Sequence, residues 1–512
     1  MWKLLLKAVL VFYFLGRIEA ARILAVFPTP SISHQVVFRP LTQELAKRGH
    51  DVVVITTNPA FPKGETPANL TEVDIHDIAY NFWRSNFKVS KKGWKDDPVL
   101  HMTHATDLFA RVFFEELKNK DFQRIIKEES FDLVFVEACA RPAFVLSNIF
   151  KAPLILISSI GALPGLFNVI GSPTHPILYP SPLNIRLYNL TIWEKVTELY
   201  KHFLLSRADD LIKKYIDEML KSHFGHDVPG IDELNNNIDM LFLNTHPILE
   251  DNRPVPPKVV YIWGLHKKPE KELPKDLQSY LDTSKNGVIY ISFGTNVNPS
   301  MLPQKRMNVF ITVLSQLPYD VLWKWDRDDE LASNIRIEKW LPQSDLLRNP
   351  KIKLFITQGG LQSTDEAISA GVPLIGVPII ADQWYNTEKY VRHKIGIQVD
   401  FDTVTEDQFR NAVNAVIGDE SYKHNVLHLR TLLSDQPQQP LERAVWWTEY
   451  VLRHSGARHL RAPAANISWT EYLMIDFFVS VLLVLLVAIL VICKIFFYVL
   501  RVIFRSTKVK KS

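Results

Sequence analysis

Short β-branched runs alternate with helical patterns along most of this 512-residue chain. Nine runs are apolar on both faces, as buried strands are: residues 22–27, 51–57, 131–138, 152–159, 239–245, 287–293, 320–325, 353–357 and 372–379. Buried strands that are separated by helices predict parallel sheets in an α/β fold. About nine strands over this length favour two doubly wound, Rossmann-like domains over one.

The clearest boundary between the two domains is the stretch "EDNRPVPPKVVYIWG", Glu250 to Gly264. Its Pro256-Pro257 pair favours an extended connector. We therefore divide the body of the chain into a first domain at 21–250 and a second domain at 260–455.

Both ends of the chain read as targeting segments. Residues 1–20 contain Lys3 and Lys7, then an apolar run, then small residues, which is the pattern of a cleavable signal peptide. The alternative is an uncleaved anchor, although the apolar run is short for a membrane span. Residues 477–500 are almost entirely apolar, and as one helix they would be about 36 Å long, enough to cross the hydrocarbon core. We therefore expect a transmembrane helix there.

The last twelve residues, 501–512, carry five basic side chains and no acidic one, which places them on the cytosolic side of the membrane. The net charge of the chain is +4, so the remainder has no basic excess, and this argues against nucleic acid as a partner. The final "KVKKS" resembles an endoplasmic-reticulum retrieval signal. The sequence thus predicts a single-pass type I protein of the endoplasmic-reticulum membrane with a lumenal body.

Three glycosylation sequons, at Asn69, Asn189 and Asn466, suit a lumenal body. The two cysteines, Cys139 and Cys493, are not expected to pair, because Cys493 lies in the apolar C-terminal stretch. No paired Cys/His spacing suggests zinc, and we expect neither a metal nor a cofactor.

The stretch "LFITQGGLQSTDEA", residues 354–367, places a strand, a Gly-Gly turn and a helix start in succession. A helix N-terminus presents free N–H groups and a partial positive charge, so a diphosphate is a natural ligand there. Ser363 as N-cap and Glu366 three residues later fit a capping box, and Gly371 fits the helix end. A plain strand-to-helix turn remains the alternative for the Gly-Gly pair alone.

Further polar and aromatic residues surround this turn in the sequence. Trp340 and Gln343 lie upstream in "KWLPQ", and Asp382 and Gln383 follow the strand at 372–379. Ligands bind beyond the carboxyl ends of strands in open α/β sheets, so an indole, an amide and a carboxylate–amide pair could together bind a nucleotide sugar. The stretch "SFGT", Ser292 to Thr295, ends another strand and could add donors to the phosphates.

The motifs "SFGT", "WLPQ" and "FITQGGLQSTDEAISAGVPLIGVPIIADQ", with the two end segments, resemble the family 1 UDP-glycosyltransferases over nearly the whole chain. The resemblance is to the membrane-bound animal enzymes and, through Gln358, to insect members. It implies a GT-B fold, in which two Rossmann-like domains face a cleft. The first domain would bind the acceptor and the second would bind the UDP-sugar.

The resemblance also implies roles for individual residues. Trp340 would stack on uracil, Gln343 and Glu366 would bind ribose, and Asp382 and Gln383 would bind the transferred sugar. The diphosphate would be served by Ser292, Thr295, Gln358, Gln362 and Ser363. Many members have His where this chain has Gln358, so we expect a donor whose charge does not depend on pH.

Each of these residues also has a purely structural interpretation. Trp340 could belong to the core, Glu366 could serve only the capping box, and Asp382 could cap a helix that starts near Trp384.

Transfer with inversion requires a base that takes the proton of the attacking hydroxyl, and a His is suited to this. His34 follows the first strand in "FPTPSISHQ", in the loop beyond the strand's end, where the family has its catalytic histidine. A helix-start histidine bonded to backbone is the alternative. A partner carboxylate would orient the imidazole. Of Asp132 and Glu137 we choose Glu137, because it ends its strand, although the family commonly has the shorter Asp there.

These patterns favour an inverting hexosyltransferase that acts on small lipophilic acceptors. The other readings are transfer from UDP-glucuronate, a UDP-sugar epimerase or hydrolase, and a membrane-tethered binding protein without activity. No Arg or Lys stands beside Asp382 and Gln383, which favours UDP-glucose over UDP-glucuronate. The sequence leaves the acceptor, and the question of a homo-oligomer, open.

Overall fold

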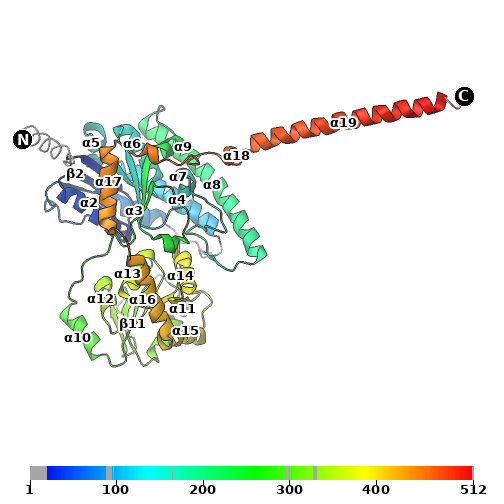
Figure 1. Cartoon of the computed structure of the whole chain (residues 1–512). Helices are drawn as coiled ribbons and strands as arrows, with labels where there is room; N and C mark the ends of the chain where they lie inside the picture. The colour runs from blue at the N-terminus through cyan, green and yellow to red at the C-terminus, as the bar shows by residue number, and fades with distance from the viewer. Residues whose placement is uncertain are drawn as a thin grey trace, which may run out of the picture.

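The computed structural model describes residues 20–87, 95, 97–163, 165–295, 297, 300, 302–326 and 331–509. The expected signal peptide therefore lies almost wholly outside the described residues. Figure 1 shows two lobes, one above the other, and a long C-terminal helix that leaves the upper lobe.

The first lobe is built on a seven-stranded, all-parallel sheet with the order β3-β2-β1-β4-β5-β6-β7. Its strands are β1 (Arg22–Phe27), β2 (Asp51–Thr56), β3 (Leu70–Asp74), β4 (Leu133–Glu137), β5 (Leu154–Ser158), β6 (Ile238–Leu243) and β7 (Val259–Tyr261). Its helices are α2 (Ile32–Lys47), α3 (His76–Asn86), α4 (Pro98–Glu116), α5 (Lys120–Glu128), α6 (Val145–Phe150), α7 (Leu166–Ile170), α8 (Ile192–Phe224) and α9 (Ile231–Leu234).

The second lobe has a six-stranded, all-parallel sheet with the order β10-β9-β8-β11-β12-β13. Its strands are β8 (Val288–Ser292), β9 (Asp320–Lys324), β10 (Ile335–Glu338), β11 (Ile352–Thr357), β12 (Leu374–Gly376) and β13 (Gly396–Gln398). Its helices are α10 (Lys275–Thr283), α11 (Gln304–Ser315), α12 (Gln343–Arg348), α13 (Leu361–Ala370), α14 (Gln383–Arg392), α15 (Glu406–Gly418) and α16 (Glu420–Ser434).

Each sheet has a hydrophobic core on both faces, because the side chains of a strand point alternately to opposite sides. In β1, for example, Leu24 and Val26 belong to one core, and Ile23 and Ala25 belong to the other. This two-sided burial explains why the nine predicted strands are continuous apolar runs. The prediction of two Rossmann-like parallel sheets is confirmed.

The connection between the lobes differs from the expected one at two places. Residues 259–261, expected in an extended connector, form β7, which pairs in parallel with β6 at the edge of the first sheet. Helix α17 (Pro440–Arg453), assigned to the second domain from sequence, packs on the first lobe, where Ala444, Val445 and Val451 join the core around α2. The chain therefore passes to the second lobe before α10 and returns between α16 and α17.

After α17 come the short helix α18 (Trp469–Tyr472) and the long helix α19 (Ile475–Val509). Within α19, Ile475–Ile503 has a mean hydropathy of 3.1 and is long and apolar enough to cross a membrane. The helix includes the expected span at 477–500 and continues into the basic segment that was expected to be a tail.

Candidate active site

The predicted base and carboxylate meet at the carboxyl edge of the first sheet. Strands β1 and β4 are parallel neighbours, so the residues that follow them lie side by side. Glu137 is the last residue of β4, and His34 lies in the first turn of α2 rather than in the loop before it. His34 Nδ1 is 2.5 Å from Glu137 Oε1, so the longer glutamate does reach the imidazole.

The carboxylate of Glu137 is held from a second side. It is almost fully buried, and its Oε2 accepts a hydrogen bond of 3.2 Å from the Thr29 N–H. Asp132, the other candidate, lies at the opposite end of the strand, where it accepts a hydrogen bond from the Arg22 N–H. The contact between Nδ1 and Glu137 leaves Nε2 of His34 as the nitrogen that can accept a proton.

Two ionisable groups near this pair were not found from sequence. Burial and the nearby Glu137 charge raise the pKa of the Cys139 thiol well above its usual value. Burial, followed by the Glu137 charge, likewise raises the pKa of Glu116, whose carboxyl oxygens have no hydrogen-bond partner among the described residues. The direction of both shifts favours the protonated, neutral form of each group. Glu116 lies inside a helix, and nothing in its sequence neighbourhood separates it from a surface glutamate.

His34, Glu137 and Cys139 are also the described residues that could together hold a metal ion, since their ligand atoms lie within 4.8 Å of one another. The Nδ1–Oε1 hydrogen bond already joins two of them, and the thiol is disfavoured as a thiolate by the same carboxylate. An ion at this point would have to break that hydrogen bond and expel the thiol proton.

At the second lobe, four polar side chains form one hydrogen-bonded group. Gln343 Nε2 donates to Ser363 Oγ at 2.9 Å and to Glu366 Oε2 at 2.8 Å, and Gln343 Oε1 accepts from the Tyr290 hydroxyl at 3.0 Å. Burial raises the pKa of Glu366. The structure thus brings three predicted residues together and adds Tyr290, which the sequence did not single out.

The predicted capping box at Ser363 and Glu366 is wrong. Helix α13 begins at Leu361 with Gly360 as N-cap, so Ser363 already lies inside the first turn and both side chains bond to Gln343 instead. The N–H groups of residues 361–363 precede the first intrahelical hydrogen bond and face outward from the helix end. The predicted end at Gly371 is correct, and its φ of +71° is the left-handed conformation that glycine adopts most easily.

Gln358 lies beside the loop that follows β8. It is buried, and its Oε1 has no hydrogen-bond partner among the described residues. A β-carbon on Gly294 would collide with Gln358 Nε2, and Gly294 has a φ of +78°, so this loop position requires glycine. Ser292 Oγ accepts a hydrogen bond from the Gly294 N–H at 3.3 Å, and Thr295 next to it is exposed.

Trp340 is not a core residue, because 67% of it is exposed. The Lys324 ammonium lies 4.9 Å from the centre of its ring and donates to the Gly294 carbonyl at 2.7 Å. Burial lowers the pKa of Lys324. Trp340 thus borders the same loop as Gln358 and presents an accessible aromatic surface there.

Asp382 and Gln383 open helix α14, but their side chains have different partners. Asp382 occupies the N-cap position without a capping hydrogen bond, and its Oδ2 accepts from Asn386 Nδ2 at 2.9 Å. Gln383 Oε1 accepts from the N–H groups of Ile379 and Ile380, both at 2.8 Å, and so holds its own loop. Helical spacing places Asn386 on the face of Asp382, a signal that could have identified it from sequence.

Asp382 of the second lobe lies within electrostatic range of His34 of the first lobe. Burial raises the pKa of this carboxyl, and the charge of His34 from the other lobe acts in the opposite direction. The predicted base and the predicted sugar-binding carboxylate are therefore close enough to interact electrostatically across the interface of the two lobes.

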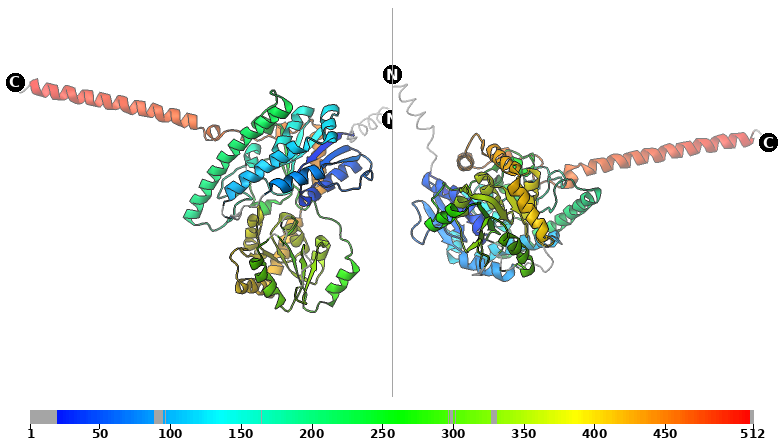
Figure 2. Two further views of the ribbon diagram at one scale, coloured as in Figure 1. Left: turned by 180° about the vertical axis from the view of Figure 1, so that it is seen from behind. Right: turned by 90° about the horizontal axis from the view of Figure 1, so that it is seen from below.

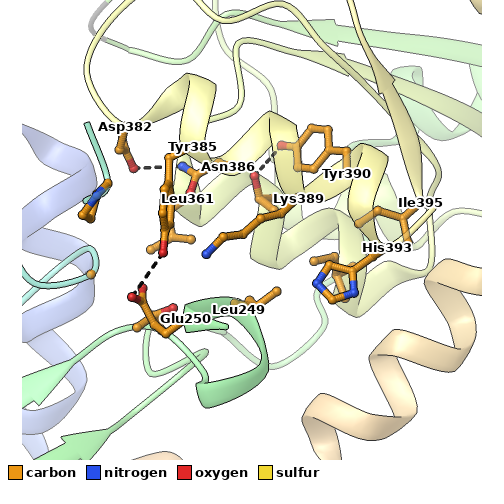
Figure 3. Close-up of a pocket in the computed structure, with 15 residues that line it drawn as sticks. Leu249, Glu250, Leu361, Asp382, Tyr385, Asn386, Lys389, Tyr390, His393 and Ile395 are labelled. Carbon is orange, nitrogen blue, oxygen red and sulfur yellow. Dashed lines mark hydrogen bonds between the residues drawn. The ribbon is translucent and has the colours of Figure 1, made fainter. Parts of the chain in front are cut away.

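A small pocket extends from Asp382 along α14 and is lined by both lobes (Figure 3). Leu249 and Glu250 line it from the first lobe, and Tyr385 and Lys389 line it from α14. The Tyr385 hydroxyl donates to Glu250 Oε2 at 3.3 Å. Burial lowers the pKa of Lys389 to about 8, against the opposing effects of Glu250 and Asp251.

Two further hydrogen bonds hold the start of α13, and the first of them comes from the other lobe. Gln362 Nε2, predicted to serve the diphosphate, donates to the Ser159 carbonyl at 2.9 Å. Trp263 Nε1 donates to Asp365 Oδ1 at 2.6 Å, and burial raises the pKa of Asp365 to about 8. Gln362, at the start of α13, thus contacts the acceptor side directly.

Comparison with known proteins agrees with this geometry. The family described as "UDP-glucoronosyl and UDP-glucosyl transferase" matches residues 22–511 of the chain. The chain belongs to the UDP-glycosyltransferase family. It is an enzyme of this family, which transfers sugars from UDP-sugar donors to small acceptors, and the predicted resemblance is confirmed.

Relatives of this UDP-glycosyltransferase are found in viruses, insects and humans. An ecdysteroid UDP-glucosyltransferase of Spodoptera littoralis nuclear polyhedrosis virus is 37% identical over 91% of this chain and 94% of its own length. UDP-glucosyltransferase 2 of Dactylopius coccus is 31% identical over 96% of each chain. Human UDP-glucuronosyltransferase 2B7 is 31% identical over 87% of each chain.

Solved structures confirm the fold of this UDP-glycosyltransferase. The kitacinnamycin glycotransferase matches with a TM-score of 0.59 at 18% identity, over 85% of this chain and 99% of its own. The calicheamicin glycosyltransferase CalG4 matches with a TM-score of 0.58 at 16% identity, over the same shares. The predicted GT-B fold is therefore correct.

Proposed function

We propose that this enzyme transfers glucose from UDP-glucose, with inversion, to a hydroxyl group of a small lipophilic acceptor. The observation that carries the proposal is the 2.5 Å contact of His34 Nδ1 with a buried Glu137, opposite Asp382 of the other lobe. A neutral imidazole oriented in this way can take the acceptor proton at Nε2 as the hydroxyl attacks the anomeric carbon. Glu137 fixes the tautomer and stabilises the imidazolium that forms.

We assign donor binding to the second lobe. Trp340 stacks on the uracil, and Gln343 with Glu366 binds the ribose hydroxyls. The diphosphate lies at the N-terminus of α13, where N–H groups and the helix dipole favour negative charge. Ser292, Thr295, Gln358 and Ser363 add donors there, and Gln362 joins them when it releases Ser159. Asp382 accepts hydrogen bonds from the sugar, with Gln383 beside it. The scheme needs no metal or cofactor.

Glucose is favoured over glucuronate by the charges near Asp382. A C6 carboxylate would need a cation, and Lys389, on the same helix, lies about two turns further along and faces Glu250. Two of the relatives are named as glucosyltransferases, and the human one is named as a glucuronosyltransferase. An ecdysteroid is therefore a suitable test acceptor beside simple phenols.

The test is a measurement of UDP release by the full-length enzyme with UDP-glucose, UDP-glucuronate and UDP-N-acetylglucosamine, each with and without acceptor. We expect release only with acceptor and fastest with UDP-glucose. Release without acceptor would indicate a hydrolase, and no release with any pair would leave only a binding protein. Substitution His34→Ala should lower kcat by about 10²–10⁴-fold. His424→Ala, on the exposed face of α16, serves as the matched control.

We further propose that α19 anchors the enzyme in the endoplasmic-reticulum membrane, with both lobes in the lumen. Asn69 and Asn189 are exposed, although the Asn69 amide makes one long hydrogen bond, 3.4 Å, to the Ala46 carbonyl. The Asn466 amide is half-buried and donates both to the Asp232 carbonyl at 2.7 Å and to Asn236 at 3.0 Å. We therefore expect glycans at Asn69 and Asn189 and none at Asn466. Endoglycosidase shifts of single Asn→Gln variants test this, and protease protection of both lobes in sealed microsomes tests the orientation.

A further inference from the structure

The first twenty residues of helix α8 contribute nothing to the hydrophobic core. The buried residues of the 33-residue helix are Ile212, Ile216 and Leu220, all in its C-terminal part. From Ile192 to Leu211 no residue is buried, a length of about 30 Å of helix. This segment, which we call the outer half of α8, covers the side of the first lobe without entering its core.

The outer half of α8 nevertheless carries a stripe of large exposed apolar side chains. Trp193 is 80% exposed and Phe203 is 58% exposed. The full stripe consists of Ile192, Trp193, Val196, Leu199, Tyr200 and Phe203. Their spacing of three and four residues places all six on one face of the helix.

Two acidic side chains on the face opposite the stripe point toward the protein, whereas Arg207 and Asp210, beyond the stripe, are exposed. Asn184 donates to the Glu198 carboxylate at 2.7 Å, and Arg141 donates to the Asp209 carboxylate at 2.5 Å. The side chain of Glu198 is only 11% exposed. A helix on the surface of a soluble protein has the opposite arrangement, with its apolar face inward and its charges in water.

This inverted arrangement indicates that the medium outside the stripe is apolar. Six large apolar side chains in contiguous helical positions exceed the scattered exposure that is normal for a soluble surface. Two of the six are Trp193 and Tyr200, and these residue types are enriched where a membrane meets water. Lys195, beside the stripe, is exposed, as basic residues are on helices that lie in a lipid interface.

The position of α19 indicates that the apolar medium outside the stripe is the membrane. In Figures 1 and 2 the outer half of α8 and the start of α19 lie on the same side of the first lobe. Tyr472, Leu473 and Met474, just before α19, are also exposed, so the apolar surface leads directly into the anchor. We propose that the outer half of α8 lies in the lipid–water interface of the membrane that α19 crosses. The inference rests on the proposed membrane anchoring by α19.

This contact would tie the acceptor end of the cleft to the membrane. Arg141, which bonds to Asp209 of α8, follows Glu137 by only four residues. The segment that carries the catalytic carboxylate is thus joined by an ion pair to the helix that we place in the interface. A lipophilic acceptor dissolved in the bilayer would then meet the enzyme at the lobe that binds it.

The proposal can be tested by site-specific photocrosslinking of the full chain in native membranes. Benzoylphenylalanine would replace Phe203 in the stripe, Leu432 in a solvent-exposed part of α16, or Phe497 in α19. We expect phospholipid adducts, detected by mass spectrometry, at position 203 and position 497 and none at position 432.

The three positions separate the outcomes. Lipid adducts at 497 but not at 203 would overturn the interfacial contact and leave the anchor intact. A covalent dimer formed through position 203 would also overturn it, because a second copy of the chain would then cover the stripe. Absence of lipid adducts at 497 would overturn the anchoring proposal itself, and adducts at 432 equal to those at 203 would show nonspecific labelling and count against the contact.

A second measurement does not depend on the crosslinker. Phe203→Glu should raise the KM for an acceptor that partitions into phospholipid but not the KM for a water-soluble phenol. Leu432→Glu is the matched control for an added surface charge. Equal KM changes for both acceptors would contradict the proposal, since a charge that merely destabilises the fold affects both alike.

Discussion

The two ends of the cleft differ in the hydrogen-bond partners of their polar residues. At the acceptor end, His34 and Glu137 are bonded to each other and to the Thr29 backbone, all within the first lobe. At the donor end, Gln343 donates to both Ser363 and Glu366, and Gln362 bonds to the opposite lobe. Gln358 has a buried oxygen without a partner among the described residues. The proposed base is therefore positioned by the fold, whereas several of the proposed donor-binding groups would have to exchange partners when a nucleotide sugar binds.

The difference follows from where the residues lie. Glu137 ends a buried strand, and His34 begins the helix after the neighbouring strand, so sheet pairing alone fixes their distance. The donor residues come from loops and helix ends of the second lobe, where side chains have more freedom. Catalysis should consequently be sensitive to small changes at the first end, and affinity should be sensitive to changes at the second.

The largest effect is expected for Glu137→Gln. An amide cannot stabilise the imidazolium, and the equivalent change in a Ser-His-Asp triad lowers kcat by about 10⁴-fold. We expect kcat to fall by up to that factor while the Kd for UDP, measured by calorimetry, stays unchanged. Glu116→Gln is the control, because burial raises the pKa of Glu116 and so favours the neutral form, which an amide resembles. A normal kcat for Glu137→Gln would remove the carboxylate from the mechanism.

Lys389, between the two ends, should make stability depend on pH. Its pKa in the folded state is about 8, below the ordinary 10.5, so burial of the cation opposes folding in full below pH 8. Between pH 8 and 10.5 the folded lysine is neutral while the unfolded one is still charged, so stability rises with pH, by on the order of 3 kcal/mol at most. The thermal midpoint of the wild type should therefore rise relative to Lys389→Met over this range, and parallel curves would contradict the prediction.

A smaller effect is expected for Gln358→Ala. Hydrogen bonds to charged groups contribute about 1.5–3 kcal/mol, so the Kd for UDP-glucose should rise by roughly 10- to 150-fold, with a lower kcat. Titration calorimetry and steady-state kinetics measure the two effects. Gln278→Ala, on α10, is a control glutamine away from the cleft. Unchanged kinetics would show that Gln358 only fills the space beside Gly294.

The smallest effect is expected for Trp340→Ala. Stacking of a base on an aromatic ring contributes about 1–3 kcal/mol, so the Kd for UDP should rise by about 5- to 150-fold. Because the residue is largely exposed, the thermal midpoint should not change. Trp446→Ala, also partly exposed, tests for a general effect of removing an indole. A fall in stability without a loss of UDP affinity would return Trp340 to a structural role.

The sequence predicted the elements whose burial is two-sided. The nine predicted strands are all present, because parallel strands covered on both faces must be continuously apolar. Strand β3 has only two buried residues among five, and β7, β10 and β13 are only three or four residues long, so their signals are too weak to recognise. Helix α17 was assigned to the wrong lobe because its amphipathic pattern shows only that one face is buried. The pattern does not show which lobe covers that face.

In the candidate site, contacts that depend on local sequence patterns were predictable, and contacts between the two lobes were not. The neighbouring ends of β1 and β4 made the pairing of His34 with Glu137 predictable, and the motif placed Gln343 near Glu366. The capping role of Ser363 was wrong because the helix begins after Gly360, three residues earlier, and a glycine can also occupy the N-cap position. The contact of Gln362 with Ser159 and the position of Lys389 against Glu250 depend on how two separate lobes meet, which local sequence patterns do not specify.

The passage of the chain between the lobes at two separate places has a mechanical consequence. With a single linker the lobes could turn freely about each other. With two, one before α10 and one between α16 and α17, rotation is easiest about the line through both linkers. Such a hinge would let the cleft widen to admit a nucleotide sugar and would then return the proposed base and the donor site to the same alignment.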